Sequence, residues 1–171
     1  MLLFVCRANL CRSAMAERLA AWHGFAAQSA GTHAVPGLEM AGNAQAVLRE
    51  FGADPAGFRS RRLTPPLLAG PALTPGLVLA ATRAERAACV TLAPAAAGRT
   101  FTLLQYGRYL AALPPGDDPF DRAALSRVRG RLQPAAPGDD DLADPIGGPL
   151  DGFRECADTI NRILSLLAAR R

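Results

Sequence analysis

The chain has 171 residues, of which half are hydrophobic and a fifth are charged; this is an ordinary composition for a globular protein of one domain. All 19 basic residues are arginines. The absence of lysine excludes a Walker-type phosphate loop and Schiff-base chemistry, because both need that residue. The net charge of +4 suits anionic ligands. Because the arginines are dispersed and few aromatic residues lie among them, we expect no nucleic-acid binding.

The cysteines and the apolar segments indicate the compartment. The sequence shows no signal peptide and no apolar stretch long enough to cross a bilayer, so we predict a cytoplasmic protein without membrane insertion. A reducing compartment argues against a disulfide framework. Cys6 and Cys11 are spaced more widely than most zinc-binding pairs, and no second close Cys or His pair follows. We therefore expect no metal and no other cofactor.

Strand and helix patterns alternate along the chain, which predicts a parallel sheet covered by helices on both faces. Strands are predicted at 1–5, 26–31, 77–82 and 100–104. Helices are predicted at 13–22, 39–51, 83–91 and 121–132, with a short helix among the loops of 59–75. A last helix is expected to carry Pro149 in its first turn. The pattern predicts one α/β domain over residues 1–171.

Apolar stripes at helical spacing indicate which helix faces are buried. In the first helix the stripe comprises Met15, Leu19 and Trp22, and in the second helix it comprises Val47, Leu48 and Phe51. The stripe of the last helix comprises Phe153, Ala157, Ile160, Leu164 and Leu167.

Reactive and polar side chains concentrate in the segment CRANLCRS, between the first strand and the first helix. Open α/β sheets bind ligands where their strands end. Backbone N–H groups of such a loop can converge on an anion, and Arg12 adds a planar fork for two phosphate oxygens. The same dipoles favour the thiolate form of Cys6, a nucleophile that can attack phosphorus in line. Asn9 tolerates a left-handed backbone, and Ser13 can donate to the sulfur.

This loop resembles the signature of the low-molecular-weight protein tyrosine phosphatases, C-x-x-N-x-C-R-S. The resemblance continues in AMAE at the start of the helix and in SAGT, which begins at Ser29. It extends to DPIGG, which begins at Asp144, and to FRECAD in the last helix. Because it spans essentially the whole chain in order, the resemblance implies the family fold, a four-stranded parallel sheet flanked by helices.

The resemblance implies a phosphomonoester hydrolase that forms a phosphocysteine intermediate without a metal. Cys6 would be the nucleophile, Arg12 would bind the phosphate and stabilise the transition state, and Asp144 would be the general acid and base. The loop and its support would comprise Arg7, Ala8, Asn9, Leu10, Cys11, Ser13 and Ser29. The substrate would be a phosphorylated protein or a small phosphomonoester, and the product would be inorganic phosphate.

The entrance departs from the family at two places. Members often carry an aromatic residue after Asp-Pro, where this chain has Ile146, and another in the turn after the second strand, here HAVPGLEM. We expect an aliphatic pocket wall made by Val35, Leu38 and Ile146, which stacks poorly on a phosphotyrosine ring. Alternatively, an aromatic ring reaches the entrance from elsewhere, the candidates being Tyr106, Tyr109 and Phe120.

Two other functions stay open at this point. An arsenate reductase could use the same oxyanion loop with an external thiol, and a catalytically silent module could bind phosphate alone. The second is disfavoured because binding needs neither a nucleophile nor an acid. Cys11 either forms a reversible disulfide with Cys6 or packs behind the loop. Cys89 and Cys156 are expected to be buried apolar residues.

Overall fold

Four short segments form one parallel sheet in the computed structural model, which describes residues 1–69 and 76–170. The strands are β1 (Leu2–Cys6), β2 (Ala27–Gly31), β3 (Leu77–Ala80) and β4 (Thr100–Thr102), in the order β2-β1-β3-β4. Each adjacent pair runs parallel. Every residue of β1 and β3 is buried, as expected for central strands covered on both faces. The predicted α/β class with four parallel strands is confirmed.

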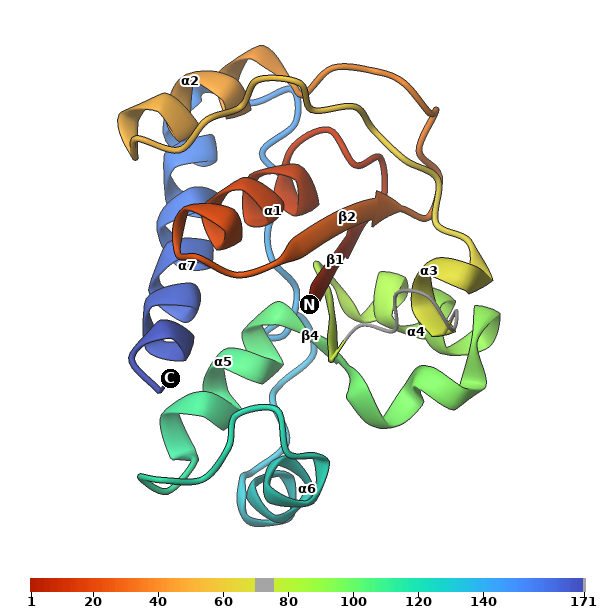
Figure 1. The fold of residues 1–171 in the computed structure, drawn as a ribbon, viewed down its shortest axis with the longest axis vertical. Helices are drawn as coiled ribbons and strands as arrows, with labels where there is room; N and C mark the ends of the chain where they lie inside the picture. The colour runs from red at the N-terminus through yellow and green to blue at the C-terminus, as the bar shows by residue number, and fades with distance from the viewer. Residues whose placement is uncertain (70–75, 171) are drawn as a thin grey trace.

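Side chains of β1 alternate between two cores, one on each face of the sheet. Leu2 and Phe4 pack with α1 (Arg12–Trp22), α2 (Gly42–Glu50), α5 (Leu103–Ala112), α6 (Arg122–Arg131) and α7 (Leu150–Ala168). Leu3 and Val5 face the smaller core, which contains α3 (Pro65–Ala69), α4 (Arg83–Leu92) and the 3-10 helix η1 (Pro94–Arg99). Figure 1 shows α3 and α4 to the right of the sheet and α2, α7 and α5 to its left.

The predicted stripe of the last helix is confirmed, since all five of its residues are buried on α7. The stripe of the first helix is confirmed at Met15 and Leu19 but is wrong at Trp22, which is 52% exposed. Trp22 is the last residue of α1, and its ring meets His23 edge-on at 4.9 Å between centroids instead of entering the core.

The largest difference from the predicted elements lies after β4. The predicted strand 100–104 ends at Thr102, whose hydroxyl accepts a hydrogen bond from the amide of Gln105 and caps α5. Helix α5 was not predicted: Leu103 and Leu104 fell in the predicted strand, and residues 105–112 fell in no predicted element. It packs tightly on α7, because a Cβ at Gly107 would lie 2.9 Å from Cγ1 of Ile163. The helix predicted at 39–51 begins only at Gly42, and Pro149 is the N-cap of α7.

The short helix predicted among the loops of 59–75 is confirmed as α3, and residues 70–75 fall outside the described residues. Within the described ranges, none of the helices is both long enough and apolar enough to cross a bilayer.

Candidate active site

The segment that follows β1 forms a tight loop around the sulfur of Cys6. Cys6 ends β1 and Arg12 begins α1, so the loop joins a strand end to a helix start. Cys6 is only 2% exposed, and its sulfur lies 3.0 Å from the hydroxyl of Ser13. The amide of Asn9 donates to the same sulfur at 3.2 Å. The hydroxyl of Ser13 and the amide of Asn9 therefore both contact this sulfur.

The loop keeps backbone donors available for an anion. In residues 1–69 and 76–170, the amides of Ala8 and Leu10 donate to no backbone or side-chain acceptor. Unpaired amides beside a helix N-terminus form a binding site for an oxyanion such as phosphate. Arg7 is exposed at the outer side of this loop, whereas Ala8 and Leu10 are half-buried.

Asn9 holds the loop in shape from inside the protein. Its φ of 57° is left-handed, a conformation that asparagine tolerates. The side chain is fully buried, and its Nδ2 donates to the hydroxyls of Ser13 at 2.9 Å and Ser29 at 2.8 Å. Its Oδ1 accepts a hydrogen bond from the amide of Arg61 at 2.8 Å. The supporting roles of Asn9, Ser13 and Ser29, which the resemblance implies, remain predictions, and this geometry is consistent with them.

Two further residues, Glu17 and Arg61, contact this support and were not selected from the sequence. Glu17 on α1 accepts hydrogen bonds from Ser29 at 2.5 Å and from Nη2 of Arg61 at 3.1 Å. Glu17 belongs to the AMAE segment, to which the resemblance pointed, whereas Arg61 lies in none of the segments that carry the resemblance. The two residues are 44 positions apart in the chain, so their contact was not visible in the sequence.

Gly31, at the end of β2, lets the loop approach closely. A Cβ at this position would lie 2.7 Å from the carbonyl oxygen of Arg7 and 2.9 Å from the amide nitrogen of Asn9. The amides of Thr32 and His33 donate to the carbonyls of Cys6 and Arg7. The turn after β2 therefore supports the loop from the side.

Arg12 and Asp144 meet at this site although they are 132 positions apart in the chain. Nη2 of Arg12 lies 2.6 Å from Oδ2 of Asp144, and Nη1 donates to the carbonyl of Leu142 at 3.2 Å. The thiol of Cys11 donates to Oδ1 of Asp144 at 3.3 Å, and the amide of Ile146 donates to the same oxygen at 3.2 Å. The structure thus brings together Cys6, Arg12 and Asp144.

The remaining thiols are poorly suited to attack. Burial, reinforced by the nearby carboxylate of Asp144, raises the pKa of Cys11 well above its usual range. Burial likewise raises the pKa values of Cys89 and Cys156 to about 12. All four cysteines are free. The described residues contain no cluster of three or more His, Cys, Asp and Glu side chains placed to hold a metal ion.

The three predicted wall residues are all exposed, with fractions of 61% for Val35, 45% for Leu38 and 51% for Ile146. Ser60 links the first two, because its hydroxyl accepts from the amide of Leu38 and donates to the carbonyl of Val35. Ile146 belongs to the separate segment that carries Asp144. The three positions are consistent with a wall at the entrance, which remains a prediction.

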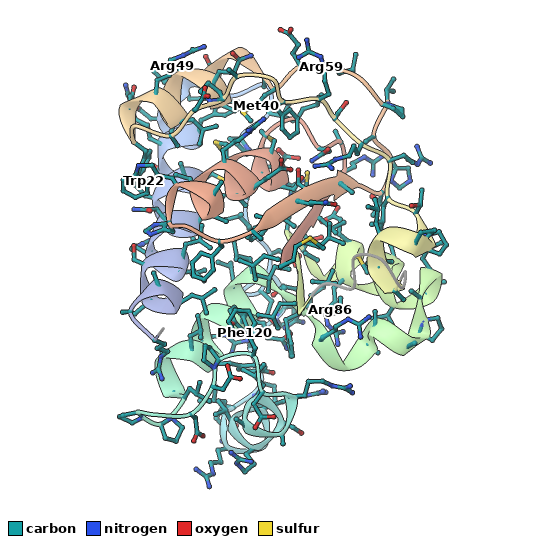
Figure 2. All side chains as sticks on the ribbon, in the orientation of Figure 1. Trp22, Met40, Arg49, Arg59, Arg86 and Phe120 are labelled. Carbon is teal, nitrogen blue, oxygen red and sulfur yellow. The ribbon has the colours of Figure 1, made fainter. Side chains whose placement is uncertain are left out.

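The three aromatic candidates for the entrance lie elsewhere. Tyr106 and Tyr109 are buried in the core, and the hydroxyl of Tyr106 donates to the carbonyl of Pro119. Phe120 packs against the same core. Figure 2 shows Phe120 low in the molecule and Arg59 at its top, where Arg59 pairs with Glu39 beside Leu38. The alternative of an aromatic ring from these positions is therefore wrong.

Comparison with known proteins identifies the family. Residues 1–138 match the family described as low molecular weight phosphotyrosine protein phosphatase. The chain belongs to this family. It is 31% identical over 172 residues to a protein-arginine-phosphatase of Geobacillus stearothermophilus, covering 99% of this chain and 94% of the relative.

Solved structures agree with this assignment. The YwlE arginine phosphatase from G. stearothermophilus matches with a TM-score of 0.72 and 29% identity, over 98% of this chain and 90% of the other. A low molecular weight protein tyrosine phosphatase from T. tengcongensis matches with a TM-score of 0.73 and 26% identity, over 99% and 98%. The protein is a cysteine-dependent phosphatase, and these relatives do not favour the arsenate reductase alternative.

Proposed function

We propose that Cys6, Arg12 and Asp144 carry out the dephosphorylation of a phosphorylated protein side chain. The observation that carries this assignment is their meeting in one site, with donors around the Cys6 sulfur and Arg12 beside Asp144. The reaction needs a nucleophile, a group that binds phosphate and a general acid. The thiol, the guanidinium fork and the carboxyl group at this loop match these three roles.

In the first step the Cys6 thiolate attacks phosphorus, and the bond from phosphorus to the leaving atom breaks. Asp144 gives its proton to that atom, while Arg12 and the loop amides bind the phosphoryl oxygens. In the second step Asp144 takes a proton from water, the water oxygen attacks phosphorus, and the S–P bond breaks. The hydroxyl of Ser13, 3.0 Å from the sulfur, stabilises the departing thiolate. Inorganic phosphate is released.

Arg12 cannot bind two anions equally well at the same time, and this competition sets the sequence of events in the reaction. In the free protein its Nη2 is bonded to Asp144. A phosphoryl group in the loop competes for the same guanidinium, because phosphate oxygens accept the same paired hydrogen bonds. Substrate binding therefore frees Asp144 from Arg12, so that the carboxyl group can turn to the leaving atom.

For the substrate we propose phosphoarginine in proteins as the first candidate. The relative with 31% identity is a protein-arginine-phosphatase, and the wall residues at the entrance of this chain are aliphatic. A phosphotyrosine ring would miss an aromatic contact, which is typically worth about 0.5–1.5 kcal/mol. The family description favours phosphotyrosine as the second candidate. Measuring kcat/KM on peptides that differ only in phosphoarginine or phosphotyrosine decides between them.

Substitution of the nucleophile tests the mechanism independently of the substrate. Cys6→Ser should abolish turnover but retain oxyanion binding, since the amides and Arg12 remain. A phosphoenzyme trapped on any residue other than Cys6 would exclude the proposal. Asp144→Asn should slow hydrolysis of an alkyl phosphate much more than that of p-nitrophenyl phosphate, whose leaving group needs little protonation. Equal loss on both substrates would remove Asp144 from the acid role.

We also propose a cytoplasmic location and a single domain over residues 1–171. The location is supported by the need for a reduced nucleophile and by four cysteines that are all free.

A further inference from the structure

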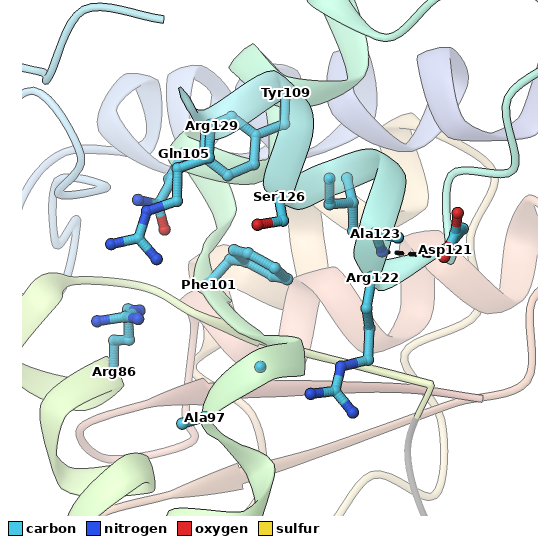
Figure 3. Close-up of a pocket in the computed structure, with 12 residues that line it drawn as sticks. Arg86, Ala97, Phe101, Gln105, Tyr109, Asp121, Arg122, Ala123, Ser126 and Arg129 are labelled. Carbon is cyan, nitrogen blue, oxygen red and sulfur yellow. Dashed lines mark hydrogen bonds between the residues drawn. The ribbon is translucent and has the colours of Figure 1, made fainter. Parts of the chain in front are cut away.

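A cavity of about 500 Å³ lies away from the catalytic loop. Residues of α4, η1, β4, α5 and α6 form its walls, as Figure 3 shows. None of the proposed catalytic or loop residues lines it. Strand β3 separates β4, at the cavity, from β1, which carries Cys6. Its volume is within the range of small-molecule sites, about 300–1,000 Å³.

Three guanidinium groups reach this cavity from two helices, namely those of Arg86 on α4 and of Arg122 and Arg129 on α6. We call it the arginine cavity. Asp121 is the one carboxylate among its lining residues. Its two oxygens accept hydrogen bonds from the amides of Ala123 and Ala124 and cap α6. The cavity therefore has an excess of positive charge.

Three arginines that do not line the arginine cavity, Arg83, Arg108 and Arg127, are paired with carboxylates. Arg83 and Arg108 share the carboxylate of Asp140, and Arg127 pairs with Asp117. In contrast, none of the three cavity arginines forms an ion pair with a carboxylate of residues 1–69 or 76–170. Among the described residues, the one hydrogen bond from these three guanidinium groups is that of Arg86, whose Nε donates to the carbonyl of Thr100 at 2.9 Å. Unpaired guanidinium groups can bind an anion from solution.

The exposed side chain of Arg122 lies over the backbone of η1. A Cβ at Gly98 would clash with its guanidinium, at 2.9 Å from Cζ. A side chain at this position would displace the guanidinium from η1.

The other walls offer an apolar surface and an unused polar atom. The rings of Phe101 and Tyr109 pack edge-to-face with centroids 5.8 Å apart, and both are lining residues. The Oε1 of Gln105 is buried and has no hydrogen-bond partner among the described residues. A buried acceptor without a partner costs free energy unless a donor, such as an N–H group of a ligand, satisfies it.

We propose that the arginine cavity binds a small molecule that carries both phosphate groups and a flat, nitrogen-containing ring, the chemistry of a nucleoside phosphate. The guanidinium forks bind the phosphate oxygens, the preferred partners of arginine. The ring lies on the apolar surface of Phe101 and Tyr109, and an amino group of the ring donates to Oε1 of Gln105. The site is separate from catalysis, so its ligand is a binder and not a substrate.

Amide signals of the isotope-labelled intact protein provide the test, because they report both sites at once. Gly98, Phe101 and Ser126 report on the cavity, and Ala8 and Leu10 report on the catalytic loop. The protein is titrated separately with ADP, inorganic pyrophosphate and adenosine, while phosphorus NMR checks that ADP stays intact. ADP should shift the cavity amides to saturation and bind more tightly than either fragment.

Matched variants identify the groups responsible. Arg86→Gln and Arg129→Gln should each weaken ADP binding at the cavity by about tenfold or more, because each removes charge-assisted hydrogen bonds. Gly98→Ala should also weaken binding by displacing Arg122. Arg127→Gln, on the same helix but paired with Asp117, is the control and should leave binding unchanged.

Three results would overturn the proposal. They are an absence of saturable shifts at the cavity amides, equal losses in Arg127→Gln and in the cavity variants, and binding of adenosine as tight as that of ADP. Pyrophosphate binding as tight as that of ADP would remove the ring from the proposed ligand. Shifts confined to Ala8 and Leu10 would assign all phosphate binding to the catalytic loop.

Discussion

Replacing Asp144 should have opposite effects on turnover and on phosphate binding. In the free protein the carboxylate is bonded to Arg12, the group that a bound phosphate also needs. Asp144→Ala removes this competitor and leaves both nitrogens of the fork open to phosphate. We therefore expect tighter binding of inorganic phosphate together with a loss of kcat of about 10²–10⁴-fold, the usual effect of losing general acid–base catalysis.

The size of the binding effect follows from the environment of the pair. The side chain of Arg12 is 6% exposed and that of Asp144 is 36% exposed, with 2.6 Å between Nη2 and Oδ2. Exposed ion pairs contribute about 0.2–1 kcal/mol, and hydrogen bonds to charged groups about 1.5–3 kcal/mol. A half-buried pair should fall between these, at about 1–1.5 kcal/mol, which corresponds to roughly fivefold to tenfold in a binding constant.

The assay is the inhibition constant of inorganic phosphate against p-nitrophenyl phosphate, checked by calorimetric titration because the variant turns over slowly. Asp141→Ala is the control, since it removes a carboxylate of the same segment that bonds the amide of Arg83 and not Arg12. The constant should fall roughly fivefold to tenfold in Asp144→Ala and stay unchanged in Asp141→Ala. An unchanged or higher constant in Asp144→Ala would refute the competition for Arg12.

Three further substitutions test the loop and its entrance. Gly31→Ala should lower kcat by about 100-fold with little loss of secondary structure by circular dichroism, because its Cβ displaces the loop at Arg7 and Asn9; retained kcat would show that the loop adapts. Cys11→Ser should slow recovery by dithiothreitol after mild peroxide. In the parent, protection should increase with pH, because the raised pKa keeps Cys11 mostly protonated and its thiolate fraction grows only as pH rises; equal recovery in both proteins would exclude a resolving role. Ile146→Tyr should lower KM for phosphotyrosine peptides more than it changes kcat, and a micromolar KM in the parent would reject the aliphatic wall.

Local patterns were enough to predict the sheet and most helices, and the reason is visible in β1 and α7. A strand buried on both faces is continuously apolar, and a helix on the surface of a core has apolar residues at helical spacing. Both signals lie within one element. Helix α5 was missed because Tyr106 and Tyr109 favour strands and Gly107 weakens helices, although its buried residues Leu103, Tyr106 and Leu110 are at helical spacing. Its packing against Ile163 on α7 comes from a distant part of the chain.

In the candidate site, too, some residues could be predicted from local sequence and others depend on contacts between distant parts of the chain. The segment from Cys6 to Ser13 could be selected because its residues are adjacent in sequence and share a known spacing. Glu17 and Arg61 could not, since their roles depend on one contact across the fold. The arginine cavity could not be predicted either, because only the fold shows which of the 19 arginines lack a carboxylate partner.

The position of Asp144 depends on the backbone of Leu142. The amide of Leu142 donates to the carbonyl of Ala81, directly after β3, and its own carbonyl accepts from Nη1 of Arg12. One peptide segment is thus bonded both to the sheet and to Arg12, the arginine proposed to bind phosphate. When phosphate draws Nη2 of Arg12 away from Asp144, the bond from Nη1 to Leu142 can remain. The segment then stays at the loop while the carboxyl group of Asp144 is free to move, and this is the arrangement that a general acid requires: a fixed backbone with a side chain released by substrate.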